Sequence, residues 1–200
     1  MSQNQSYKDI ALKAKELIDI KLEDHKKRLI HSYGVAKMAQ YLAERYGIDP
    51  YMAKAAGYMH DYSKYDDFNE LKYLLNEDER IECEKYPFLY HAYLSAYYFK
   101  ELISDNIDIY NAIKYHVFGR LNMSKLEEII MISDFTEENR EYEACIRARK
   151  ILIEDNNLYL AIIESLKSTI SHCQAEGKKP HPMQLEIIKE YEKKMEIKDE

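Results

Sequence analysis

The sequence predicts an all-α protein that folds as a single helical domain. Glycine and proline are sparse, with five and four among 200 residues. Sheets need frequent tight turns built from these residues, so their scarcity favours long helices with few connections. Apolar residues recur three and four positions apart along most of the chain, which places them on one face of a helix. Because 46% of the residues are hydrophobic, the chain can fill a sizeable core.

The first three helices follow from apolar spacing and from their end signals. Helices are expected over residues 7–23 and 24–46, where apolar residues recur at helical spacing. Gly47 ends the second, as a glycine just past a helix often does. Asp49 and Pro50 then begin a third helix, with the aspartate as N-cap and the proline at the first helical position.

The rest of the chain also indicates helices joined by short connections. Further helices are expected over residues 70–75, 78–83, 88–103, 107–117, 124–137, 141–154 and 157–174, and in a charged segment after residue 182. Ser124 and Glu127 match the pattern of a capping box. No repeat or linker divides the chain. We therefore expect one domain over residues 1–200, with its core at about 24–140 and the helices of 141–196 packing on that core.

Composition excludes several classes of function. The net charge of −7 provides no basic surface for nucleic acid, and no apolar stretch approaches the ~18 residues needed to span a bilayer. The N-terminal residues are polar and do not resemble a signal peptide. The three cysteines are far apart, which favours structural thiols and a cytoplasmic location. The amphipathic first and last helices either cap the core or form the interface of a homodimer.

One pair of adjacent residues is chemically unusual. His60 and Asp61 lie in the apolar run Ala-Gly-Tyr-Met-His-Asp-Tyr-Ser-Lys, residues 56–64, and the third helix is expected to carry them into the core. A carboxylate removed from water costs several kcal/mol or more unless it is paired or binds a metal. The pair therefore requires a partner inside the protein.

Other polar residues share this inward placement. His31 lies on the same helical stripe as Val35 and Leu42, and three more residues have comparable apolar neighbours: His91, His116 and Asp134. Each histidine alone is more often a hydrogen-bonded core residue than a ligand. Together, four histidines and two aspartates would need six separate partners, whereas one shared metal centre satisfies all six. His25 and His172 are expected outside this set.

The order of His31, the pair His60-Asp61 and Asp134 resembles the H…HD…D pattern of the HD-domain metal-dependent phosphohydrolases. Longer segments resemble one bacterial subfamily, the YqeK-like symmetrical diadenosine tetraphosphate hydrolases. These segments are residues 28–35, 56–64, 90–92, 112–116, 119–124 and 133–140. The resemblance covers about residues 8–190 and implies a helical HD-domain bundle that hydrolyses diadenosine tetraphosphate to two ADP.

The resemblance also implies roles for individual residues. One metal would be held by His31, His60, Asp61 and Asp134, and Asp61 would bridge to a second metal completed by His91 and His116. Iron is favoured, with manganese or zinc as alternatives. Catalytic roles fall to Asp61 and Lys64. Contacts to a nucleotide substrate are expected from Arg28, Lys64, Gly119, Arg120, Arg140 and His181. The alternatives are surface ion pairing for the three arginines, and a surface role for His181 in place of one at a pocket mouth.

The chain departs from the subfamily pattern at residues 116–119, which read His-Val-Phe-Gly where His-Thr-Thr-Gly or His-Thr-Ser-Gly is usual. Apolar groups thus replace hydroxyls next to His116. Three other functions stay open on this evidence. They are a different HD-domain nucleotidase or phosphodiesterase, a non-catalytic nucleotide-binding regulator, and a structural helical adaptor.

Overall fold

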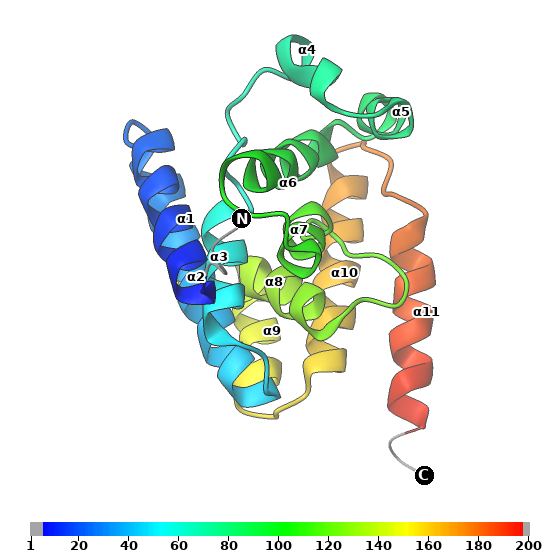
Figure 1. Cartoon of the computed structure of the whole chain (residues 1–200). Helices are drawn as coiled ribbons and strands as arrows, with labels where there is room; N and C mark the ends of the chain where they lie inside the picture. The colour runs from blue at the N-terminus through cyan, green and yellow to red at the C-terminus, as the bar shows by residue number, and fades with distance from the viewer. Residues whose placement is uncertain (1–5, 198–200) are drawn as a thin grey trace.

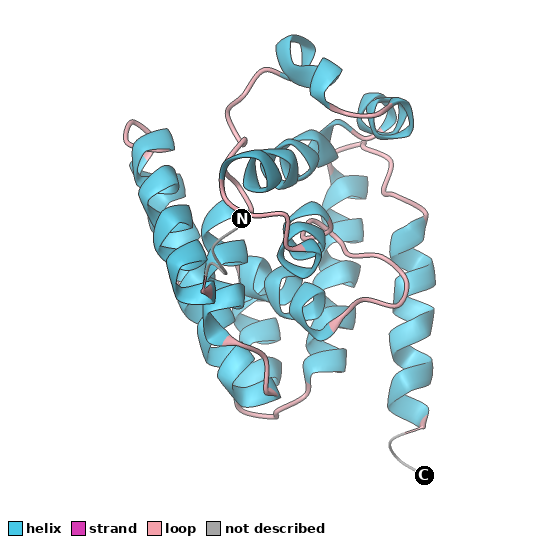
Figure 2. Ribbon diagram, viewed as in Figure 1, coloured by secondary structure: helices cyan, strands magenta, loops and turns pink. Residues whose placement is uncertain are grey.

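Helices form all the regular secondary structure of the computed structural model within residues 6–197, the part of the chain that it describes (Figure 2). The α-helices are α1 (Tyr7–Lys21), α2 (Lys26–Tyr46), α3 (Pro50–Met59), α4 (Phe68–Leu71), α5 (Glu77–Lys85), α6 (Tyr90–Leu102), α7 (Ile107–Lys114), α8 (Lys125–Thr136), α9 (Glu143–Ile153), α10 (Leu158–Ala175) and α11 (Met183–Glu196). Short 3-10 turns precede α5 and α6, at Lys72–Leu74 and Pro87–Leu89. The predicted all-α fold is confirmed.

The helices enclose one hydrophobic core. α3 packs against α1 and α2, and α8 lies between α2 and α7. α6 crosses above α7, while α10 and α11 pack together on the far side from α1 (Figure 1). Large side chains such as Leu42, Phe99, Ile130 and Tyr191 are fully buried between these layers. The arrangement brings α2, α3, α6, α7 and α8 together around one point.

A close contact between α2 and α3 depends on Gly57. A Cβ added to this glycine would lie 2.7 Å from Cα of Ala36, which is backbone and cannot move aside. Both helices carry further small buried residues, among them Ala39 of α2 and Ala53 of α3. The short distance between the helices places the C-terminal end of α3 beside the first half of α2.

The third helix is shorter than its sequence pattern predicts. α3 ends at Met59, so His60 and Asp61 lie in the turn that follows rather than within the helix. The backbone there makes i+3 hydrogen bonds, with the N–H of Lys64 donating to the carbonyl of Asp61 at 3.1 Å. The expectation of helix through Asp61 was wrong because this tight turn keeps a similar residue spacing. α7 likewise ends at Lys114, before His116.

The predicted capping box of α8 is only half formed. The hydroxyl of Ser124 accepts a hydrogen bond from the backbone N–H of Glu127, as expected for an N-cap. The carboxylate of Glu127 instead receives two hydrogen bonds from Arg120, at 2.7 and 3.0 Å. Arg120 therefore fastens the loop between α7 and α8 to the start of α8.

Other composition-based expectations concern the surface and the thiols. No helix among residues 6–197 combines the length and the apolar character that crossing a membrane requires. The cysteines are free, with Cys83 and Cys145 buried. α1 is one of the two helices expected either to cap the core or to form a homodimer interface, and its Leu12 and Ile20 are exposed. The homodimer stays a prediction.

Candidate metal centre

Six side chains from five parts of the chain meet in the middle of the bundle. They are His31 of α2, His60 and Asp61 after α3, His91 of α6, His116 after α7, and Asp134 of α8. Their ligand atoms form three overlapping groups in which all atoms lie within 4.8 Å of one another. These are His31-His60-Asp61, His60-His116-Asp134 and Asp61-His91-His116. The structure thus brings together all six residues that the sequence pattern selects.

Two of the imidazoles are oriented by hydrogen bonds on the side away from this centre. Nδ1 of His60 donates to the carbonyl of Gly57 at 2.7 Å, and Nδ1 of His116 donates to that of Ile113 at 2.8 Å. A carbonyl only accepts, so Nδ1 carries the proton and Nε2 keeps its lone pair for the centre. This is the arrangement in which proteins hold metal-binding histidines.

Asp61 occupies the middle of the cluster and presents its two oxygens to different partners. Oδ2 lies 3.3 Å from Nε2 of His60, and Oδ1 lies 3.1 Å from Nε2 of His91. The residue is only 1% exposed, yet Oδ1 accepts no hydrogen bond within the described residues. A buried carboxylate oxygen without a hydrogen bond is costly unless a cation binds it. The side chain therefore fits a metal ligand, and its geometry suits a bridge between two metals.

The charge states of the cluster also suit metal binding. Burial raises the pKa of Asp61, but His60 and Lys64 outweigh it and hold this pKa well below its usual range. Burial also raises the pKa of Asp134, but Arg140 and His31 outweigh it and hold this pKa well below its usual range. Burial together with the neighbouring His60 lowers the pKa of His116 to about 3. The ionised carboxylates and the neutral imidazole of His116 are in the charge states that divalent metals require of their ligands.

A residue outside the predicted set, Glu137, orients a third histidine, His31. Its Oε1 lies 3.1 Å from Nδ1 of His31, and its Oε2 accepts two hydrogen bonds from Asn139 at 2.8 Å. Glu137 is 1% exposed. The space for it depends on Gly34, where an added Cβ would lie 2.1 Å from Oε2. One available signal was spacing, because Glu137 follows Asp134 by three residues at the end of the same helix.

Basic side chains surround the open side of the cluster. Nζ of Lys64 lies 3.1 Å from Nε2 of His91 and 3.4 Å from Oδ1 of Asp61. Arg28 and Arg140 pair with the carboxylates of the cluster, at 2.6 Å to Asp61 and 2.7 Å to Asp134. Both arginines also line a pocket of about 600 Å³, here called the metal-side pocket. Its walls are Lys27, Arg28, Ile30, His31, Tyr65, Glu137, Asn139, Arg140 and Glu141.

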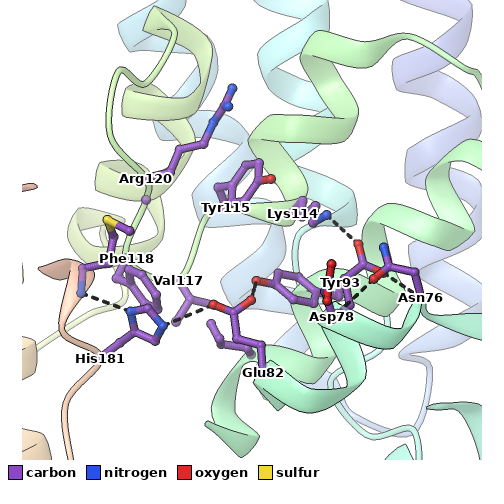
Figure 3. A pocket seen from close by; sticks show the side chains of 14 residues that line it. Asn76, Asp78, Glu82, Tyr93, Lys114, Tyr115, Val117, Phe118, Arg120 and His181 are labelled. Carbon is purple, nitrogen blue, oxygen red and sulfur yellow. Dashed lines mark hydrogen bonds and ion pairs between the residues drawn. The ribbon is translucent and has the colours of Figure 1, made fainter. Parts of the chain in front are cut away.

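The other predicted substrate contacts lie in a separate pocket of about 360 Å³, lined by Gly119, Arg120 and His181 (Figure 3). None of the six cluster residues lines it. Leu89 and Tyr93 do, two residues before and after His91, so this pocket lies on the side of α6 away from the cluster. The substrate-binding roles of Gly119, Arg120 and His181 stay predictions. They concern a different pocket from the one that Arg28 and Arg140 line.

The unusual Val117-Phe118 segment also belongs to that separate pocket. Phe118 is 6% exposed and stacks on the ring of His181, with ring centroids 4.7 Å apart. Nε2 of His181 in turn lies 3.2 Å from a carboxylate oxygen of Glu82. Neither Val117 nor Phe118 lines the metal-side pocket.

Comparisons with known proteins agree with this geometry. A family model described as "HD domain" matches residues 28–155. The chain is 35% identical to "Bis(5'-nucleosyl)-tetraphosphatase, symmetrical" of Halalkalibacterium halodurans, over 85% of this chain and 90% of that protein. It is 36% identical to the Bacillus subtilis protein of the same description, over 72% of this chain and 77% of that one.

A solved structure is also similar to the chain in fold and in sequence. The crystal structure of a "predicted HD superfamily hydrolase involved in NAD metabolism" from Clostridium acetobutylicum superposes with a TM-score of 0.79 at 29% sequence identity. The match covers 94% of this chain and 98% of that one. Fold and sequence therefore place the chain among the same relatives.

Proposed function

Because the chain belongs to the HD-domain family, we propose that it is a metal-dependent phosphohydrolase that cleaves diadenosine tetraphosphate symmetrically into two ADP. The relatives named as symmetrical tetraphosphatases support this substrate and this position of cleavage. The observation that carries the proposal is the position of Asp61. Its two oxygens face different imidazoles within a buried cluster, and basic side chains line the open side.

Two metal ions fit the cluster, and we propose that they are iron, with manganese or zinc as alternatives. His31, His60, Asp61 and Asp134 would hold the first, and Asp61, His91 and His116 the second. Mixed imidazole and carboxylate ligands without thiolate suit these metals. When bound, such a pair supplies Lewis acidity, which acidifies water and offsets the negative charge of phosphoryl groups.

The protein's own groups would bind and orient the polyphosphate. Lys64 is 32% exposed, so its ammonium group would be available to a phosphoryl oxygen bound at the cluster while its position next to Asp61 is kept. Arg28 uses Nη1 for Asp61, which leaves its other nitrogens for a phosphate. Arg140 uses Nε and Nη2 for Asp134, which leaves Nη1. Ion pairs with the ligand carboxylates thus fix both arginines at the edge of the pocket.

The test is product analysis on a panel of nucleotides. The protein is purified anaerobically, loaded with iron or manganese, and incubated with diadenosine tetraphosphate, nucleoside monophosphates and a cyclic dinucleotide. Chromatography should find ADP as the only product of the tetraphosphate and little turnover of the others. AMP together with ATP would contradict symmetrical cleavage. Preferred turnover of another nucleotide would favour a different HD-domain activity, and tight binding without any product would favour a regulator.

A further inference from the structure

A second pocket continues the metal-side pocket along the surface. This outer pocket is lined by Glu23, Asp24, His25, Lys26, Lys27 and Tyr65. Lys27 and Tyr65 line both pockets, so the two pockets adjoin, and together they are called the groove here. His31, a residue of the metal cluster, lies at the inner end of the groove.

An aromatic pair stands where the two pockets meet. The rings of His25 and Tyr65 are nearly parallel, with an interplanar angle of 14° and centroids 3.7 Å apart. Tyr65 remains 53% exposed. His25 occupies the N-cap position of α2 but makes no capping hydrogen bond with its side chain. Tyr65 also lines the metal-side pocket and His25 does not, so His25 leaves part of Tyr65 uncovered on that side.

The balance of charge along the groove changes at this aromatic pair. The metal-side pocket holds Lys27, Arg28 and Arg140, and Lys27 makes no ion pair with any residue of 6–197. Beyond Tyr65, the outer pocket adds the carboxylates of Glu23 and Asp24 and one further cation, Lys26. Phosphates are therefore favoured more strongly on the inner side than on the outer side, which orients a nucleotide with its uncharged base outward.

The length of the groove matches half of the proposed substrate. His25 precedes His31 by six residues, which corresponds to about 9 Å along the axis of a helix. Two phosphates and a ribose span a comparable distance. A phosphate bound at the metal cluster would thus carry its base to the level of Tyr65.

We propose that Tyr65, backed by His25, is a stacking platform for the base of one ADP half of the substrate, and that Lys27 contacts the phosphates of that half. This inference rests on the proposed function for the identity of the nucleotide. Every base has a flat π-face, so a stacking platform tolerates all of them. The guanine analogue of the substrate should therefore be hydrolysed at a rate similar to that of the adenine form.

The test compares Tyr65→Ala with Tyr65→Phe, which keeps the ring, and with Tyr73→Ala, an exposed tyrosine that lines neither pocket. Stacking on an aromatic side chain accounts for roughly a 5- to 100-fold change in affinity. We expect Tyr65→Ala to raise KM for diadenosine tetraphosphate by this factor with kcat little changed. The two control variants should match the wild type.

Calorimetry of ligand binding separates this inference from the proposed function. In metal-loaded protein, Tyr65→Ala should weaken ADP binding by the same factor and leave pyrophosphate binding unchanged, because pyrophosphate has no base. Unchanged KM and unchanged ADP affinity in Tyr65→Ala would overturn the platform while leaving the proposed function intact. If the wild type releases no ADP from the tetraphosphate, the proposed function fails, and the comparison of ADP with pyrophosphate still decides the platform.

Discussion

Glu137 holds His31 from behind: its Oε1 lies 3.1 Å from Nδ1 of the imidazole, while Nε2 of the same ring lies 3.0 Å from Asp134 in the cluster. A carboxylate behind a ligand histidine fixes the ring and makes it more basic. Glu137 also accepts two hydrogen bonds from Asn139 at its other oxygen. The position of one proposed ligand thus depends on a residue that does not itself reach the centre.

Glu137→Gln should weaken metal binding about 10- to 100-fold, the usual effect of losing such a partner. Glutamine has one acceptor oxygen, so either His31 or Asn139 would face its NH2 group as donor against donor. The measurement is metal affinity by competition with a chelator. Glu138→Gln serves as the control, since this neighbour is exposed and pairs with Lys37. Equal affinity in both variants would contradict the role given to Glu137.

Lys64→Ala should lower kcat by about 10²-fold or more, because a charged donor aimed at a phosphoryl group would be lost. Metal content should stay at the wild-type level, since Lys64 is not among the proposed ligands. Steady-state kinetics and metal quantification on the same sample check both statements. Lys13→Ala, an exposed lysine of α1, should leave both unchanged. Loss of metal in Lys64→Ala would instead indicate a structural role.

Gly57→Ala should destabilise the fold by about 1–3 kcal/mol or more, because the added methyl group would press on the backbone of Ala36. Denaturant unfolding of the metal-free protein measures this. Gly34→Ala is the informative comparison, because its methyl group would meet the side chain of Glu137 instead. We expect that variant to lose metal affinity as well as some stability. A Gly57→Ala protein as stable as the wild type would show that α2 and α3 are not closely packed.

His181 should make the fold sensitive to acid. Burial lowers its pKa, against the opposing effect of Glu82, whereas in the unfolded chain a histidine titrates near ~6.5. Above that pH the side chain is neutral in both states. As the pH falls through ~6.5, His181 takes up a proton in the unfolded chain before it does so in the folded protein, so the free energy of unfolding decreases.

The free energy of unfolding of metal-free protein, measured at about pH 8 and about pH 5, tests this sign. His181→Gln should lose less stability on acidification than the wild type. His172→Gln, at a histidine whose side chain is 73% exposed, is the control and should behave like the wild type. A larger acid sensitivity in His181→Gln would contradict the assignment.

Much of the fold follows from local pattern. Apolar spacing located the long helices, and Gly47 ends α2 in the left-handed conformation that its place after the helix indicates. The turn at His60 and Asp61 was not predicted, because successive i+3 turns keep nearly the spacing of a helix. The capping box predicted at Ser124 is only half formed. Arg120, from the preceding loop, binds the Glu127 carboxylate that would have completed it.

The cluster could be predicted because six polar residues on apolar segments need a common partner. The role of Glu137 could not, since it depends on the space that Gly34 leaves on a different helix. Tertiary packing alone also decides which pocket a residue lines. It places Arg28 and Arg140 beside the cluster, and Arg120 and His181 beyond α6.

The metal content of Asp61→Ala beside that of the wild type tests the central claim most directly. Reconstituted wild-type protein should hold two metal ions per chain, because Asp61 faces both groups of imidazoles. The variant should hold fewer than one and should release no ADP from diadenosine tetraphosphate. A wild type with less than one metal per chain, or an Asp61→Ala variant with full metal content and full hydrolysis, would contradict the account.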